Sequence, residues 1–281
     1  MVNSMNVAFA NRMPPRFPEP WASEWGEDRA HGLFMLLDVG DARQMFRWIM
    51  PGTFIMGSPE TEQQRDDDEI QHQVTLTQGF WLADSACSQA LWQAVMGDNP
   101  SVFKDNPNNP VENVSWHDCQ AFIERLNAGF EDLHARLPTD AEWEYACRAG
   151  TTTPFSFGNT VTPEQVNYDG NYPYANSKKG LYREKTVSVK SLPPNPWGLY
   201  EMHGNVWEWC QDWYGDYDHQ AVTDPTGVEQ GGYRVVRGGS WHDLGGYCRS
   251  AYRNRFVPDY RYYTIGFRLA LGRQGASSTG Q

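Results

Sequence analysis

Oxygen-bearing side chains gather in one tryptophan-rich stretch, NPWGLYEMHGNVWEWCQDW, at residues 195–213. Glu201, Asn205 and Glu208 lie there among glycines, which permit the tight turns of an irregular backbone. Turns of this kind leave backbone carbonyls unpaired. Carboxylate, amide and carbonyl oxygens held close together are the ligands that calcium prefers. The stretch therefore predicts a site for a hard cation, with calcium as the candidate ion.

The cysteines and histidines offer softer ligands. The five cysteines occur singly, without a CxxC spacing: Cys87, Cys119, Cys147, Cys210 and Cys248. Free buried thiols in a reducing cytoplasm are the default interpretation, and one disulfide is the alternative. His242, Asp243 and Cys248 fall within seven residues and form a second candidate metal set, unless Cys248 is a core thiol. The sequence contains no GxSxG, Walker A or GxGxxG motif, so hydrolase and nucleotide-binding functions have no support.

A loop-rich scaffold must position these residues. Twelve Trp, fourteen Tyr, 26 Gly and 18 Pro indicate short strands and ordered loops. A helix is expected over 88–97, and two more begin at capping boxes headed by Ser115 and Thr139. Strands are expected within 33–56 and 73–83. The acidic run at 60–69 is expected to be a solvated loop, and the region after Thr151 is expected to be irregular.

Charge and length limit the functional class. The net charge of −12 argues against nucleic acid and against anionic membrane surfaces as partners. No apolar stretch is long enough to predict a membrane helix, and no signal peptide is visible, so a cytoplasmic location is expected. We expect an N-terminal arm at 1–30, one domain at 31–271 and a disordered tail at 272–281.

Six motifs, in order, resemble the formylglycine-generating-enzyme (sulfatase-modifying-factor) family. They are PGTFIMGSPE, PVENVSWHDCQAFIERLN, RLPTDAEWEYACRAGT, GLYEMHGNVWEW, RVVRGGSW and IGFRLAL. The resemblance implies an α+β fold: a single C-type-lectin-like domain, loop-rich, with short strands and two or three helices. It also implies a structural calcium ion, because the family residues matching Glu201, Gly204, Val206 and Glu208 ligate calcium, the middle two through backbone carbonyls. A second family calcium site would map to Asn167, Tyr168, Lys179 and Leu181, where Lys179 replaces an acidic ligand.

The resemblance makes a specific statement about catalysis. In the copper-dependent oxidases of the family, two cysteines after the GGSW motif bind copper as thiolates. Here Cys248 matches the second cysteine, but Asp243 stands at the first position. Since Cu(I) prefers a two-sulfur site, copper is not expected and a noncatalytic role is favoured. The alternative is a copper- and oxygen-dependent formylglycine-generating oxidase of a protein cysteine. The iron-dependent branch, which uses three histidines and an added N-terminal domain, is not matched.

Residues 242–264 suggest what a noncatalytic member would do. Frame residues (Cys248, Arg249, Ser250, Arg253, Pro258, Asp259 and Arg261), which are expected to point inward, alternate with a chemically mixed set. We call this the variable-like set: His242, Asp243, Leu244, Gly245, Gly246, Tyr247, Tyr252, Asn254, Phe256, Val257, Tyr260, Tyr262, Tyr263 and Thr264. The frame arginines are candidates for ion pairs with Asp259 and other acids.

The variable-like set lacks Lys, Glu, Gln, Met and Trp, as randomising the first two bases of an Asn codon would give. It resembles the variable proteins of diversity-generating retroelements, which display such residues on a C-type-lectin-like scaffold. The resemblance implies a ligand-binding surface for a protein or other macromolecule. Tyrosine enrichment also resembles antibody binding sites. The alternative is an ordinary noncatalytic family member whose aromatics line a core edge.

Overall fold

The computed structural model describes residues 13–272. Three α-helices lie in this range, together with one short 3-10 helix. They are α2 (Gln89–Met96), α3 (Trp116–Gly129), α4 (Asp140–Arg148) and η1 (Gly245–Cys248). Both predicted capping boxes are present: the Ser115 hydroxyl accepts from the Asp118 N–H at 3.1 Å, and the Thr139 hydroxyl accepts from the Glu142 N–H at 3.1 Å. The helix starts are therefore set locally, as expected.

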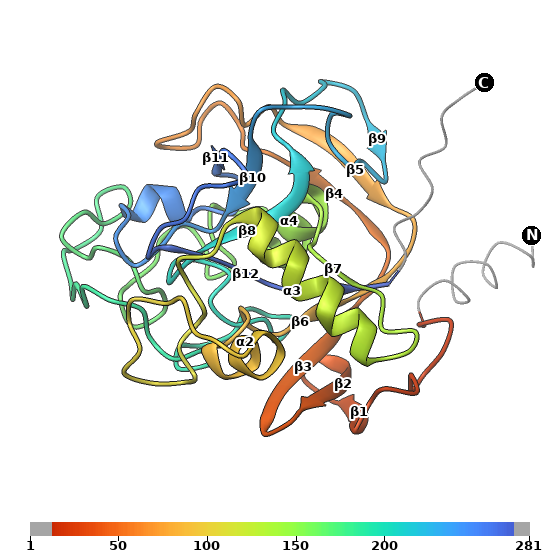
Figure 1. The fold of residues 1–281 in the computed structure, drawn as a ribbon. Helices are drawn as coiled ribbons and strands as arrows, with labels where there is room; N and C mark the ends of the chain where they lie inside the picture. Colours follow the sequence, from red (N-terminus) through yellow and green to blue (C-terminus); the bar gives the residue numbers. More distant parts are fainter. Residues whose placement is uncertain (1–12, 273–281) are drawn as a thin grey trace, which may run out of the picture.

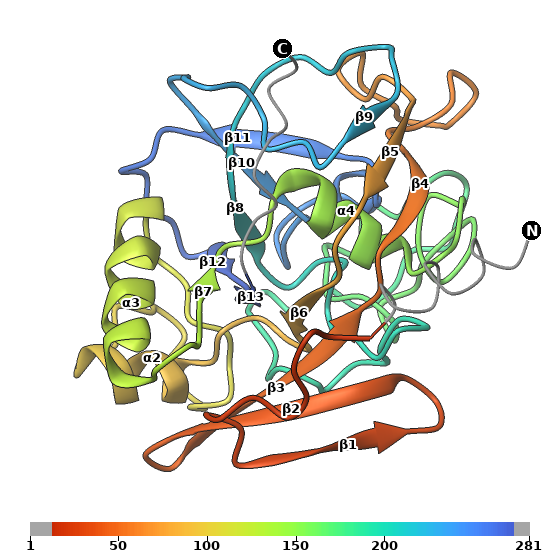
Figure 2. The same cartoon turned by 90° about the vertical axis from the view of Figure 1, so that its right-hand side faces the viewer.

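A six-stranded antiparallel sheet forms one end of the molecule (Figure 2). In spatial order its strands are β1 (Glu24–Asp28), β2 (Gly32–Val39), β3 (Ala42–Ile49), β6 (Phe80–Ala83), β13 (Ala270–Leu271) and β7 (Ala135–Arg136). Strand β13, close to the end of the described chain, lies between β6 and β7. The N-terminal and C-terminal parts of the sequence therefore share one sheet.

Two smaller sheets complete the architecture. A four-stranded sheet has the order β11 (Arg253–Phe256), β10 (Arg234–Arg237), β8 (Trp207–Trp213) and β12 (Ile265–Phe267). A three-stranded sheet consists of β4 (Gly52–Met56), β5 (His72–Leu76) and β9 (Val222–Thr223), and β9 lies at the opposite end of the molecule from β1 (Figures 1 and 2). The strands of the four-stranded sheet flank the loops that carry residues 242–264.

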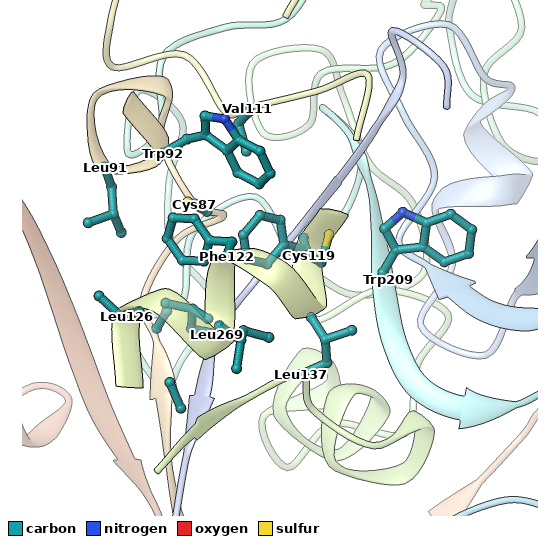
Figure 3. Packing of buried hydrophobic residues seen from close by; sticks show 14 of the residues in the cluster. Cys87, Leu91, Trp92, Val111, Cys119, Phe122, Leu126, Leu137, Trp209 and Leu269 are labelled. Carbon is teal, nitrogen blue, oxygen red and sulfur yellow. The ribbon is translucent and has the colours of Figure 1, made fainter. Parts of the chain in front are cut away.

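The largest apolar core lies where α2 and α3 pack together beside the sheets (Figure 3). Trp92 of α2 stacks on Phe122 of α3 at 5.3 Å, and Phe122 meets Phe267 of β12 edge-on at the same distance. All five cysteines are buried free thiols, so the expectation that none of them forms a disulfide is confirmed. The expected single, loop-rich α+β domain is confirmed as well.

Two sequence-based expectations need correction. Residues 24–28 form β1 and Trp21 is buried, so the last part of the predicted N-terminal arm belongs to the domain. β1 pairs with the adjacent β2 across the short turn at 29–31, and its side chains are mostly exposed, which is why the charged and Pro-rich composition of residues 1–30 suggested an arm. Within the acidic run, Glu69 is fully buried rather than solvated. Of the predicted tail, 273–281 lie outside the described residues.

Candidate functional site

Asp243 occupies the turn that follows β10. Its carboxylate accepts hydrogen bonds from the Ser240 hydroxyl and from the Trp207 indole, and burial raises its pKa. Its backbone carbonyl accepts from the Asp169 N–H at 2.9 Å. The carboxylate is half-buried and tied into the scaffold. Its contacts therefore give it a structural role in holding the turn.

Asp243 does not form a metal centre with its neighbours. His242 is exposed, and its Nδ1 makes a 2.7 Å hydrogen bond with the Tyr182 hydroxyl. Cys248 is fully buried on η1, where burial raises the pKa of its thiol well above the usual value. Between residues 13 and 272, no three His, Cys, Asp or Glu side chains are grouped to hold a metal ion. The candidate set of His242, Asp243 and Cys248 is therefore wrong.

A row of aromatic rings runs along the outside of this region. Phe256 stacks on Tyr260 with ring centroids 4.7 Å apart, and Tyr260 stacks on Tyr262 at 6.0 Å. Tyr262 then meets Tyr263 at 4.2 Å, and the two hydroxyls are 3.1 Å apart. Tyr260 and Tyr262 are 36% and 39% exposed. We call these four residues the tyrosine row.

The tyrosine row rests on a buried aromatic support. Tyr263 lies 5.7 Å from the ring of Trp241, which is only 5% exposed, and 6.2 Å from Phe103. Tyr182 stacks on the other side of this cluster, 6.1 Å from Trp241. Two loops distant in sequence therefore hold the row in place. The sequence reasoning missed Phe103 and Tyr182, and the only signal for Trp241 was its place in the GGSW motif.

The variable-like set divides into three groups by exposure. Six members are exposed: His242, Leu244, Tyr247, Val257, Tyr260 and Tyr262. Four are half-buried: Asp243, Asn254, Phe256 and Tyr263. Four are buried, contrary to the expectation of display: Gly245, Gly246, Tyr252 and Thr264.

Packing explains the buried members. A side-chain carbon added at Gly245 would lie 2.6 Å from the backbone nitrogen of Tyr174, and one added at Gly246 would overlap the Gln64 side chain. Tyr252 is covered by the exposed ring of Tyr247, which stacks on it at 4.6 Å. These positions thus support the surface without forming part of it.

The frame residues also differ from one another in burial. Arg249 and Arg253 are buried, as expected; Arg249 pairs with Glu69 at 2.6 Å, and Arg253 pairs with Asp140 at 3.2 Å. Arg261 and Asp259 are exposed, so the expectation that they point inward is wrong. Arg261 pairs with Asp118 of α3 at 2.6 Å instead of with the carboxylate of Asp259.

The proposed calcium residues are buried and well hydrogen-bonded. The carboxylate of Glu201 accepts from the backbone N–H groups of Lys190 and Leu192, and burial raises its pKa to about 7. Glu208 accepts from the Trp143 indole at 2.7 Å and forms a two-point pair with the Arg268 guanidinium. A calcium ion at Glu208 would share the carboxylate with that protein cation.

The backbone around Gly204 offers further oxygens. The Gly204 carbonyl accepts from the Val206 N–H at 3.0 Å, and Gly204 bridges to Asn167. Asn167 Oδ1 is buried there without a hydrogen-bond partner among the described residues. A buried acceptor without a donor is a position that a cation would stabilise. Calcium at Glu201, Gly204, Val206 and Glu208 stays a prediction.

Residues 40–272 match the sulfatase-modifying factor enzyme 1-like domain family. The chain belongs to this family. It is 35% identical over 208 residues to the formylglycine-generating enzyme of Mus musculus, covering 71% of this chain and 53% of that protein. It spans about half the length of the curated relatives it matches.

Two solved structures have the same fold. Treponema denticola variable protein 1 superposes with a TM-score of 0.73 at 29% identity, over 85% of this chain and 98% of that one. PvdO from Pseudomonas aeruginosa superposes with a TM-score of 0.70 at 26% identity, over 84% and 97%. Both superpositions extend over almost the whole of the solved chain. No helix of residues 13–272 has the length and apolar character needed to cross a membrane.

Proposed function

We propose that this protein is a noncatalytic binding protein that presents the tyrosine row and its exposed neighbours to a protein or other macromolecular ligand. The observation that carries the proposal is the gathering of Tyr260, Tyr262 and Tyr263 into one contiguous row over a buried Trp241. An aromatic core edge, the alternative for these residues, would bury the rings instead. Tyr260 and Tyr262 keep more than a third of their surface exposed.

The physics of recognition supports this role. A tyrosine ring supplies a large contact area and a polar hydroxyl, and few torsions are frozen when it binds. Neighbouring rings hold one another in place here, so the surface is ordered before a ligand arrives. Pre-ordering of this kind reduces the entropic cost of association. Tyrosines at the centre of an interface are common binding hot spots.

The comparisons support a displayed, variable surface. The solved structure named a variable protein superposes over almost its full length with this chain. The six exposed members of the variable-like set lie in 242–262 and each is exposed over about a third or more of its surface, so their side chains can change with little effect on the core. The ligand surface of this proposal is therefore narrower than the fourteen residues that the sequence suggested.

The second candidate is a copper- and oxygen-dependent oxidase of a protein cysteine, favoured by the identity with formylglycine-generating enzymes. Two features disfavour it. Asp243 is anchored by Ser240 and Trp207 at the position of the first family cysteine, and Cys248 is a buried thiol whose raised pKa keeps it protonated. A lone protonated thiol lacks the thiolate pair that Cu(I) prefers.

A pair of matched libraries tests the binding proposal. The first randomises the exposed positions Tyr247, Val257, Tyr260 and Tyr262, and the second randomises the buried positions Gly245, Gly246, Tyr252 and Thr264. Both are displayed and selected against hen egg-white lysozyme as a fixed target. We expect most members of the first library to fold and to yield binders, and most of the second to fail to fold.

The gene locus provides an independent test. A diversity-generating system requires a reverse transcriptase and a near-copy of the 3′ end of this gene nearby. A locus without both, or a first library that does not fold, contradicts the proposal.

A further inference from the structure

A pocket of about 420 Å³ is lined by residues of the three-stranded sheet, the start of α4 and the segment 212–228. Its volume is in the range of small-molecule sites, roughly 300–1,000 Å³. None of its lining residues belongs to the variable-like set. Met56 and Tyr217 form part of its wall, and three buried side chains with acidic or basic groups line it as well: Asp140, Asp212 and Arg253.

No side chain of residues 13–272 forms a salt bridge with Asp212, and the charge of Arg253 offsets only part of the rise in the pKa of Asp212. Asp212 is 4% exposed, and Oδ2 accepts only the backbone N–H of Asp140, at 3.0 Å. Asp140 forms salt bridges with two guanidinium groups, that of Arg237 at 2.6 Å and that of Arg253 at 3.2 Å. Burial, and after it the charge of Asp140, raises the pKa of Asp212 well above the usual value. A buried carboxyl in this state would be stabilised by an incoming cation.

Arg253, in contrast, has a buried N–H donor without an acceptor among the described residues. Its guanidinium lies between the rings of Tyr214 and Tyr217, at 4.6 and 3.7 Å from their centroids. Nε donates to Asp140 and Nη2 donates to the Gly215 carbonyl, but Nη1 is buried without an acceptor. Buried donors are nearly always paired, so an unpaired one at a pocket wall calls for an oxygen from a ligand or a water.

We propose that this pocket binds a small molecule carrying a cationic amine beside an acceptor oxygen, with the amine on Asp212 and the oxygen on Arg253. A free amino acid and the N-terminal residue of a peptide share this chemistry. The wider lining favours a cation too, since it holds five aspartates and one arginine. The aromatic and apolar wall provided by Tyr217 and Met56 would contact the remainder of the ligand.

Titration calorimetry on the full chain tests the proposal. The probes are L-leucine, L-glutamine and L-lysine at millimolar concentration, each compared with its Nα-acetyl derivative. A tri-alanine peptide, with and without N-terminal acetylation, distinguishes a peptide N-terminus from a free amino acid. We expect saturable binding of at least one free amine and at least a tenfold loss of affinity on acetylation.

Two variants locate the site. Asp212→Asn keeps an oxygen for the Asp140 N–H but removes the charge, and it is expected to weaken binding at least tenfold. Asp67→Asn, the same substitution at an exposed aspartate outside the pocket, is the matched control and should leave amine binding unchanged. No saturable binding by any free amine, or equal affinity for the acetylated forms, overturns the proposal. Because the acetylation test uses the unaltered chain, it holds even where a variant does not fold. Failure here leaves the macromolecular binding proposal untouched, since the two sites share no residue.

Discussion

Replacing Arg249 by methionine tests most directly what holds the proposed binding surface in place. Arg249 is fully buried and donates five hydrogen bonds: one to Glu62, two to Glu69, and one each to the carbonyls of Gln64 and Gly246. These contacts join the loop 58–69 to η1, which carries Tyr247. Removal of the guanidinium leaves the Glu69 carboxylate buried without its cation.

The expected loss of stability follows from the burial of Arg249 and Glu69. Breaking a buried ion pair by removing one partner destabilises a protein by about 3–5 kcal/mol, because an uncompensated charge remains inside. Arg261→Met is the matched control, since the Arg261 and Asp118 side chains are 49% and 29% exposed. An exposed pair of this type contributes about 1 kcal/mol or less. The two substitutions change the same chemical group and differ mainly in burial.

The loss of stability caused by Arg249→Met should also depend on pH. Burial raises the pKa of Glu62 even in the presence of Arg249, whose hydrogen bond and charge oppose the shift. Without the guanidinium the pKa of Glu62 rises further. A carboxyl with a folded-state pKa above its unfolded value loses stability as pH rises through that pKa. The penalty of Arg249→Met is therefore largest above neutral pH and shrinks on acidification.

Urea unfolding followed by tryptophan fluorescence measures both effects, at pH 7.5 and at pH 5. We expect Arg249→Met to lose a large part of the unfolding free energy at pH 7.5 and a smaller part at pH 5. Arg261→Met should change the unfolding free energy little at either pH. A loss below about 1 kcal/mol at pH 7.5, or equal losses for the two variants, would refute the reasoning from burial.

Three further outcomes are expected. Tyr262→Ala should barely change the unfolding midpoint but should abolish ligand binding if this ring is an anchor. Trp241→Ala should instead lower the unfolding free energy by about 3–5 kcal/mol, because it removes a buried aromatic. The protein, supplied with copper and a cysteine-containing sulfatase-type peptide, should form no formylglycine by mass spectrometry; turnover that disappears on Cys248→Ser would contradict this. A calcium chelator should lower the melting temperature if Glu201 and Glu208 hold calcium, and an unchanged temperature together with no calcium by elemental analysis would count against that site.

Local features of the fold were predictable because short-range contacts determine them. The capping boxes at Ser115 and Thr139 each join residues three positions apart, so the sequence alone contains both partners. The free thiols followed from the spacing of single cysteines. The motifs also indicated the family and its fold, since each retains the local residue pattern of a turn, a strand or a capped helix.

Only the tertiary structure decided which acids neutralise the buried arginines and which variable-like residues face solvent. Arg249 meets Glu69, 180 positions earlier in the chain, and no local pattern specifies such a pair. Gly245 is buried because the loop around Tyr174 packs against it, and Arg261 is exposed because α3 supplies Asp118 at the surface. Exposure is a property of everything that packs around a residue. The sequence thus specified the aromatic and charged groups, while long-range packing determined which of them are exposed on the proposed binding surface.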